Sequence, residues 1–386
     1  MKAIKLKENI YWVGGIDWNL RNFHGYLTQC GSTYNAYLII DEKITLIDTT
    51  KYYLVDELLQ RISSVIEPSK IDYIISNHTE MDHSGGLPKL MEICPNAEII
   101  VSPAGEKGLK AHYKKNWKFK IVKTGDKLKI GKYTLDFVLT PMIHWPDNMA
   151  AYLSEEKILF SNDAFGQHIA SYERFDDEYP LDMIIREAQK YYANIVLCYS
   201  GQVINALKTL ANLQIDIIAP SHGIIWRNNI PEILKYYKKW SANEFDNCAA
   251  IIYDTMWNST KILAESIQTA FENKNIKTQM FSLQHNHISD IMTDLMNAKY
   301  ICVGSPTLNN NIFLTVFVFL IYMKGLVLKN RVGLAFGSFG WSGQSVDIVN
   351  DILKSCGFQM LEPIKAQYIP DKIALDNIVK NLESKL

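Results

Sequence analysis

The stretch NHTEMDHSGG, residues 77–86, places four side chains that can bind metal ions within six positions. These side chains are His78, Glu80, Asp82 and His83. The run IDYIIS before the stretch is typical of a strand, and the two glycines at its end are typical of a loop. A loop at the end of a strand can direct several side chains to one point. The stretch therefore predicts a metal site.

Three other segments, which we also expect to be strand ends, supply further candidate ligands. They are His144 in PMIHWPDN, Asp163 in FSNDAFG and His222 in APSHG. Taken singly, such a histidine is more often a hydrogen-bonded loop or core residue, and such an aspartate is more often a turn cap. Taken together with the first loop, they give enough ligands for two metal ions. Asp163 is the candidate for a shared ligand because a carboxylate has two oxygens.

The composition is that of an ordinary globular protein. Of the 386 residues, 48% are hydrophobic and 21% are charged, and the net charge of −1 gives no indication of a nucleic-acid partner. The N-terminus, MKAIKLKENIYWVGG, lacks the apolar core of a signal peptide. The apolar run IFLTVFVFLIYM (312–323) is too short to span a bilayer, and we expect it to be a buried segment. The sequence thus predicts a cytoplasmic protein without membrane or nucleic-acid contacts.

The cysteines are scattered, and none belongs to a CxxC pair. We expect buried free thiols in a reducing compartment. The same spacing excludes a thiolate zinc knuckle and a rubredoxin-type iron site within the chain. The six positions are Cys30, Cys94, Cys198, Cys248, Cys302 and Cys356.

The pattern of elements changes near residue 246. Before it, short strands with glycine turns precede helical stretches expected around 180–192 and 202–213. After it, strands, loops and helices alternate from CAAIIYDT (248–255) onwards, which is typical of a doubly wound parallel sheet. The segment KKWSANEFDN (238–247) is a plausible link. We therefore predict two domains, residues 1–246 and 247–386.

The motif HxExDH, followed by distant His, Asp and His, resembles the metallo-β-lactamase fold, which is an αββα sandwich. Hydrolases of that fold usually carry HxHxDH and bind zinc, whereas this chain has Glu80 at the second position. Zinc suits imidazole-rich tetrahedral sites, while carboxylates favour harder ions with more ligands. Four imidazoles and three carboxylates fit a non-haem di-iron centre. The charge of Glu80 would stabilise the higher oxidation state that a redox site needs.

Three loops at successive strand ends of the second domain predict an FMN site. They are DTMWNST (254–260), GSPTLNNN (304–311) and GSFGWSGQ (337–344). The first loop offers hydroxyls and backbone N–H groups at a helix start, which suits a phosphate, although an N-cap cluster is the alternative. In a flavodoxin-like sheet, ligands lie beyond the carboxyl ends of the strands. The residues expected to bind FMN are Thr255, Met256, Trp257, Asn258, Ser259, Thr260, Ser305, Pro306, Thr307, Asn309, Asn310, Gly337, Ser338, Phe339, Gly340, Trp341 and Gly343.

HxExDH joined to a flavodoxin-like domain resembles the flavodiiron proteins over essentially the whole chain, including FHGY (23–26) and YYANI (191–195). The resemblance implies two iron sites. One would be held by His78, Glu80, His144 and Asp163, and the other by Asp82, His83, Asp163 and His222. It also implies that His24 and Tyr191 donate hydrogen bonds or protons beside the centre, while packing is the alternative role for both.

The same resemblance implies reduction of O2 to water, of NO to N2O, or of both, with FMN feeding the two irons. It implies an external electron donor, first a rubredoxin and second a reduced deazaflavin cofactor, and a head-to-tail homodimer or a dimer of such dimers. A zinc hydrolase of the metallo-β-lactamase fold with a flavodoxin-like appendage is the main rival, and Glu80 and the flavin loops argue against it. A pure electron carrier is the third possibility, but seven ligands are more than a structural metal site needs.

Overall fold

The computed structural model describes residues 1–386, which divide into two compact units. The N-terminal unit comprises residues 1–191 and 201–238, and the C-terminal unit comprises residues 192–200 and 239–386. The expected boundary after residue 246 falls at the start of β17, and the domain limits stay a prediction. No helix combines the length and the apolar character that crossing a membrane requires.

The N-terminal unit contains two main sheets. The first has the strand order β1-β2-β7-β8-β9-β10-β11 and the second the order β12-β13-β14-β15-β16, while β3 pairs with β6 and β4 with β5. The strands are β1 (Ile4–Lys7), β2 (Ile10–Trp12), β3 (Gly15–Asp17), β4 (Asn22–Phe23), β5 (Tyr26–Leu27), β6 (Ser32–Tyr34), β7 (Tyr37–Ile39), β8 (Thr45–Ile47), β9 (Tyr73–Ile75), β10 (Glu98–Val101), β11 (Phe119–Ile121), β12 (Lys127–Lys129), β13 (Thr134–Leu139), β14 (Met149–Leu153), β15 (Ile158–Asn162) and β16 (Ile217–Pro220).

The central strands of the first sheet are buried on both faces. Neighbouring side chains in a strand point to opposite faces, so each strand contributes to two cores. Ile75 and Ile100 belong to the core between the two sheets, whereas their neighbours Ile74 and Ile99 belong to the core beneath the helices. This double burial explains why these segments are continuously apolar and not alternating.

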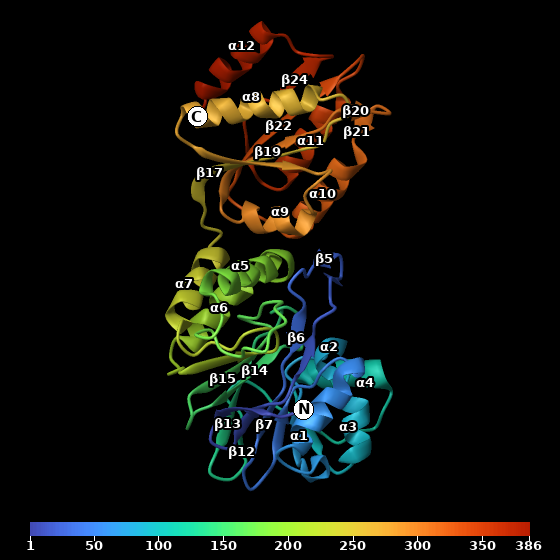
Figure 1. Ribbon diagram of the computed structural model, residues 1–386, viewed down its shortest axis with the longest axis vertical. Helices are drawn as coiled ribbons and strands as arrows, with labels where there is room; N and C mark the ends of the chain where they lie inside the picture. The colour runs from blue at the N-terminus through green and yellow to red at the C-terminus, as the bar shows by residue number, and fades with distance from the viewer. The chain divides into compact units, whose positions relative to one another are not determined.

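Helices cover the outer faces of the two sheets. Residues of α1, α3 and α4 belong to the helix-side core of the first sheet, and Figure 1 shows these helices together on one side. Helices α6 and α7 pack along β14 and β15 of the second sheet. The sandwich therefore has the αββα layers expected from the sequence. The helices of this part of the chain are α1 (Val55–Ser63), α2 (Met81–Ser84), α3 (Leu87–Ile93), α4 (Pro103–Tyr113), α5 (Leu181–Tyr191), α6 (Ser200–Leu210) and α7 (Ile230–Ser241).

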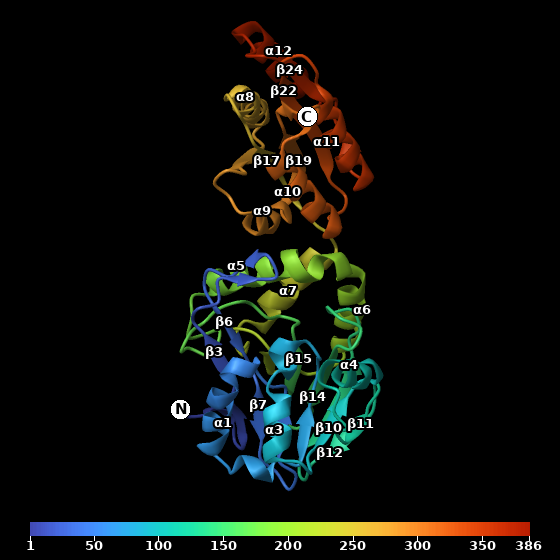
Figure 2. The ribbon, with the colours of Figure 1, turned by 90° about the vertical axis from the view of Figure 1, so that its right-hand side faces the viewer.

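The C-terminal unit is a doubly wound parallel sheet with the order β18-β17-β19-β22-β23, and β24 extends it by pairing with β22. Every pairing in this sheet is parallel. Figure 2 shows α8 on one face and α11 on the other. The elements are β17 (Asp246–Tyr253), α8 (Ser259–Asn273), β18 (Lys277–Ser282), α9 (Ile288–Leu295), β19 (Ala298–Gly304), β20 (Thr307–Leu308), β21 (Asn311–Ile312), α10 (Leu314–Gly325), β22 (Val332–Phe339), α11 (Gln344–Ser355), β23 (Gln359–Met360), β24 (Ile364–Gln367) and α12 (Lys372–Glu383).

The apolar run at 312–323 forms most of α10, and the expectation that it is a buried segment is wrong for one face of this helix. Phe319 and Leu320 are fully buried, but Leu314 is 72% exposed and Phe317 and Ile321 are each 48% exposed. The helix covers the sheet with one side only, and its period of 3.6 residues turns the other side outwards. Because the run is apolar all round, the sequence contains no polar stripe that would have revealed the exposed face.

All six cysteines are free, as expected, but only two of them are buried. Cys94 and Cys302 lie in the cores, whereas the other four are partly exposed. The expectation of buried thiols is therefore wrong for those four.

Candidate functional site

The loop after β9 is held in a fixed shape by its neighbours. The backbone N–H of Asn77 donates to Asp48 Oδ1 at 2.8 Å, and Ser84 Oγ donates to the Thr79 carbonyl at 2.8 Å. Gly85 allows a close backbone approach, since a Cβ there would lie 2.4 Å from the Met81 carbonyl oxygen. The loop leads directly into the short helix α2, which carries two of the predicted ligands and ends next to Gly85.

One group of predicted ligands gathers around Asp163 Oδ2. His78 Nε2 lies 3.7 Å from this oxygen, and His144 Nε2 lies 3.4 Å from it. Both imidazole nitrogens are also 3.3 Å from Glu80 Oε2. These four residues come from three separate strand ends, and they offer two imidazole nitrogens and two carboxylates to one point.

The second group gathers around the other oxygen of the same carboxylate. His83 Nε2 lies 3.0 Å and His222 Nε2 lies 3.4 Å from Asp163 Oδ1. The same nitrogens are 3.4 Å and 3.3 Å from Asp82 Oδ2. Asp163 therefore faces one group with each oxygen, which is the arrangement of a bridging ligand.

The donor set fits a pair of cations. Asp163 is completely buried, yet neither of its oxygens has a hydrogen-bond partner, and Asp82 Oδ1 is also without one. Buried carboxylate oxygens without donors are strongly destabilising unless a cation is close. Harder ions with several ligands suit such a mixture of imidazole and carboxylate better than zinc does.

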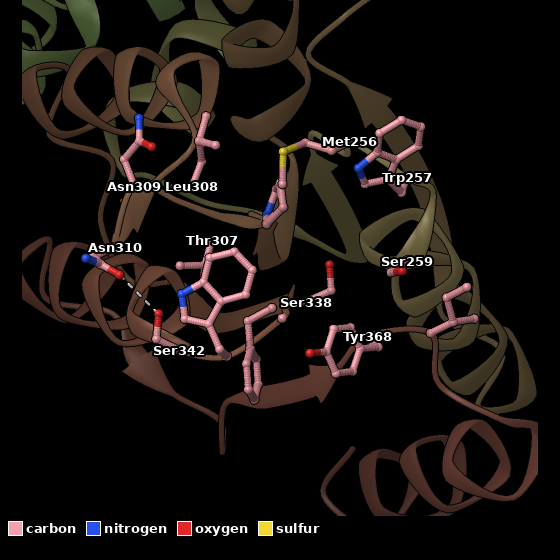
Figure 3. Close-up of a pocket in the computed structure, with 15 residues that line it drawn as sticks. Met256, Trp257, Ser259, Thr307, Leu308, Asn309, Asn310, Ser338, Ser342 and Tyr368 are labelled. Atoms are coloured by element: carbon pink, nitrogen blue, oxygen red, sulfur yellow. Dashed lines mark hydrogen bonds between the residues drawn. The ribbon is translucent and has the colours of Figure 1, made fainter.

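The C-terminal unit contains a large pocket at the carboxyl ends of its strands, with a volume of about 750 Å³ (Figure 3). Its walls come from the three loops predicted to bind FMN, together with the segment after β24. The volume lies in the usual range for a small-molecule site. The predicted residues that line it are Met256, Trp257, Ser259, Pro306, Thr307, Asn309, Asn310, Ser338, Phe339, Gly340 and Trp341.

The second loop of this pocket is a tight hairpin between β20 and β21. Asn309 and Asn310 both have left-handed backbone angles, with φ of 53° and 56°. Two successive residues of this kind form the hairpin turn that matches the twist of the strands, and asparagine tolerates this conformation well. The turn places both asparagines on the pocket wall, and Ser342 Oγ donates to Asn310 Oδ1 at 3.2 Å (Figure 3).

Comparisons with known proteins agree with the two domains. The family model described as ODP family beta lactamase matches residues 33–223, and the flavodoxin model matches residues 251–380. The chain is 41% identical to a rubredoxin-oxygen oxidoreductase of Megalodesulfovibrio gigas over 100% of both chains. It is also 41% identical to a nitric oxide reductase of Moorella thermoacetica, over 96% of this chain and 94% of that relative.

The structure of the flavodiiron protein from Giardia intestinalis superposes with a TM-score of 0.96. The two chains are 32% identical, and the match covers 100% of this chain and 96% of that one. This chain belongs to the flavodiiron proteins. Membership confirms the fold expected for both domains and the expectation that the protein is an oxidoreductase. It also confirms the expected cofactors, FMN and a non-haem di-iron centre. The zinc hydrolase alternative is not favoured.

The outer nitrogens of two predicted ligands of this flavodiiron protein are fixed by residues that sequence reasoning missed. His78 Nδ1 lies 2.9 Å from Asp147 Oδ2, and the backbone N–H of Thr79 donates to the same oxygen at 2.7 Å. His222 Nδ1 donates to the Thr33 carbonyl at 2.8 Å. Such partners orient the ring so that Nε2 faces the metal. Asp147 stands three positions after His144 in the quoted HWPDN, which was the only available signal.

The carboxylates and imidazoles of this centre shift one another's pKa values. Burial by itself lowers the pKa of His222, but the nearby carboxylates of Asp163 and Asp82 raise it to about 10. Burial by itself raises the pKa of Asp163, yet the neighbouring His83 and His222 hold it well below its usual range. The carboxylates therefore stay ionised and attract positive charge, from protons on the imidazoles or from metal cations.

The two residues predicted to act beside the centre lie in contrasting surroundings. His24 is exposed on its outer side, and its Nε2 lies 3.1 Å from Glu80 Oε1. Tyr191 is buried, with its ring 5.9 Å from the ring of His222. Burial, followed by repulsion from the nearby carboxylates, raises the pKa of Tyr191 well above its ordinary value. The Tyr191 hydroxyl is therefore protonated and able to donate.

Six residues predicted to bind FMN do not line the pocket. They are Thr255, Asn258, Thr260, Ser305, Gly337 and Gly343. Several of these shape the loops from behind: buried Thr260 lies with its Oγ1 2.8 Å from Ser338 Oγ, and a Cβ on Gly337 would lie 2.1 Å from the Ser305 carbonyl oxygen. Four residues of the wall were not predicted, namely Leu308, Ser342, Tyr368 and Ile369.

Proposed function

We propose that this flavodiiron protein reduces O2 to water, NO to N2O, or both, at its di-iron centre, with electrons that pass through FMN from an external donor. The observation that carries the proposal is the buried carboxylate of Asp163, which presents one oxygen to each of two ligand groups. The names of the relatives support both gases, since one is a rubredoxin-oxygen oxidoreductase and another a nitric oxide reductase.

The chain's role at the centre is to bind two metal ions and to fix their positions. The first ion would be held by His78, Glu80, His144 and Asp163, and the second by Asp82, His83, Asp163 and His222. When bound, FMN and the irons supply the transfer and storage of the electrons that reduce the gas. Asp147 and Thr33 keep two of the imidazoles in the orientation that ligation needs.

Protons must reach the centre, because both reactions consume them. His24 connects solvent to Glu80, since its side chain is 73% exposed while its Nε2 touches the carboxylate. Tyr191 supplies a protonated hydroxyl from a buried position beside His222. We assign both residues the roles of hydrogen-bond or proton donors to the reacting gas.

The flavin pocket would hold FMN between the three loops and the segment after β24. The start of α8 at Ser259 offers backbone N–H groups and a hydroxyl for the phosphate, while Trp257 and Trp341 offer apolar ring surface for the flavin. Both indoles are more than four-fifths exposed, at 86% and 87%, so both are accessible to a ligand ring.

The partners belong to the same proposal. A rubredoxin is the expected electron donor, in line with the name of the relative from Megalodesulfovibrio gigas, and a reduced deazaflavin cofactor is the alternative. We also propose a head-to-tail homodimer, or a dimer of such dimers, in which the flavin of one subunit serves the irons of the other. The proposed location is the cytoplasm.

The test is metal and flavin analysis followed by gas consumption, on protein expressed with iron and purified without oxygen. Two irons and one FMN per chain, with electron-dependent loss of O2 or NO, are expected. Reduced rubredoxin and reduced deazaflavin are then compared as donors. Two zincs despite ample iron, or full gas reduction by an Asp163→Asn variant, would refute the proposal.

A further inference from the structure

A small, partly open pocket lies in the N-terminal unit, between the second sheet and helix α6. Its volume is about 20 Å³, and its walls include Leu159 of β15, Val203 and Leu207 of α6 and Tyr237 of α7. A cavity of this size holds about one small molecule. It is separate from the flavin pocket and includes none of the predicted metal ligands.

Two of the polar groups near this pocket already have partners within the protein. Ser161 Oγ donates to the Ala164 carbonyl at 2.7 Å, and the backbone N–H of Phe165 donates to the Tyr237 hydroxyl at 2.6 Å. The rings of Phe165 and Tyr237 pack with their centres 4.4 Å apart. A water molecule needs two or more polar partners, so a pocket with such apolar walls holds water weakly and favours apolar guests.

The pocket adjoins the metal centre through the chain itself. Ile143, which lines the pocket, is bonded directly to His144. Ala164 and Phe165, which also line it, follow directly after Asp163. His144 and Asp163 belong to one predicted ligand group, so the pocket lies immediately behind the two loops that carry them.

We propose that this pocket binds one small apolar gas molecule, O2 or NO, and supplies it to the adjacent metal centre. The inference rests on the proposed function for the identity of the gas. Because both gases are small and weakly polar, each partitions from water into a pocket with apolar walls. The pocket raises the local gas concentration behind His144, and no covalent or redox step occurs in it.

Xenon is a suitable probe, because it binds dry apolar cavities and is visible by diffraction. Crystals of the protein loaded with FMN and iron, pressurised with xenon, are expected to show one atom between α6 and Phe165. Leu207→Ala enlarges the pocket and is expected to raise the occupancy. Ala206→Leu fills it and is expected to abolish the xenon site. Absence of xenon in both the native protein and Leu207→Ala would overturn the proposal.

Kinetics then test whether the pocket supplies the centre. In Ala206→Leu, the KM for gas is expected to rise about fivefold with kcat unchanged, since a site that only concentrates substrate affects binding alone. The KM values for O2 and for NO are measured separately, which shows which gas uses the pocket. Asn205→Leu is the matched control, because it adds the same side chain at the adjacent, exposed position of α6.

Two outcomes separate this inference from the proposed function. If Ala206→Leu loses xenon but keeps its KM for both gases, the pocket is a packing defect and the inference is wrong, while the function stands. If the native protein reduces neither gas, the proposed function fails, and with it the role of the pocket, even where xenon binds.

Discussion

The ligands of the metal centre are largely buried, whereas the walls of the flavin pocket are largely exposed. His78 and Asp163 have no solvent exposure, but Trp257 and Trp341 are 86% and 87% exposed. Each imidazole and carboxylate of the centre interacts with several others at short range. The flavin pocket instead gathers many independent side chains around about 750 Å³ of space. The first arrangement concentrates binding free energy in a few residues, and the second distributes it.

The largest effect is expected at the carboxylate that both ligand groups share. Asp163→Asn removes one charge and one ligand oxygen from the centre, so we expect iron content below about a tenth of normal and gas reduction lowered roughly a thousandfold. Metal analysis and gas uptake measure both. The control is Asp216→Asn, an exposed carboxylate beside β16 that should change neither. An Asp163→Asn protein with two tightly bound irons would remove the contrast between the two sites.

A residue that orients a ligand should matter less than the ligand itself. Asp147→Asn weakens the ion-dipole contact with His78 Nδ1, and we expect iron affinity to fall about 10- to 100-fold. Competition with a chelator measures the change, and unaltered FMN binding in the same variant shows that the fold is intact. If iron affinity does not change, His78 is held by packing alone.

A single aromatic wall of the flavin pocket should contribute a smaller share. Trp341→Ala removes apolar ring surface, and we expect FMN affinity to fall about tenfold, by analogy with ring stacking on nucleobases. Flavin fluorescence during titration of the apoprotein measures it. Trp341→Phe keeps a ring and should recover most of the affinity. Complete loss of FMN in the alanine variant would mean that this pocket also concentrates its binding free energy in one residue.

The smallest effect is expected at the rim of the same pocket. Ser342→Ala removes an exposed hydrogen bond to Asn310, where water replaces the lost partner, so FMN affinity should change less than about threefold. The same titration detects it. A change as large as that of Trp341→Ala would show that the hairpin turn, and not the ring surface, governs flavin binding.

The sequence predicted the metal cluster better than the flavin pocket, for a physical reason. The ligands are reactive residue types at strand ends, where the fold brings them together, so His144, Asp163 and His222 could be named in advance. Their supports could not be named in the same way. Thr33 acts through a backbone carbonyl, which has no sequence signature, and the contact of Asp147 with His78 joins residues 69 positions apart.

The flavin pocket was only partly predictable because the sequence of a loop does not show which of its side chains point into a pocket. Thr260 and Ser305 belong to the predicted loops but lie behind the wall, while Leu308 within one loop faces the pocket. Tyr368 and Ile369 were missed because they follow a short terminal strand without glycines or hydroxyls to indicate a ligand loop. The exposed face of α10 was missed since its sequence is apolar on every side.

Side chains along β9 point alternately to the two faces of the first sheet, and this determines how the strand responds to an inserted or deleted residue. Ile74 and Ile75 face different cores, and β9 ends at Ile75, only three residues before the ligand His78. Gain or loss of one residue here would exchange the two faces of the strand and rotate the imidazole away from Asp163 in the same event. An insertion or deletion at this point would therefore lower both stability and metal binding, and we expect the strand to tolerate substitutions better than changes in length.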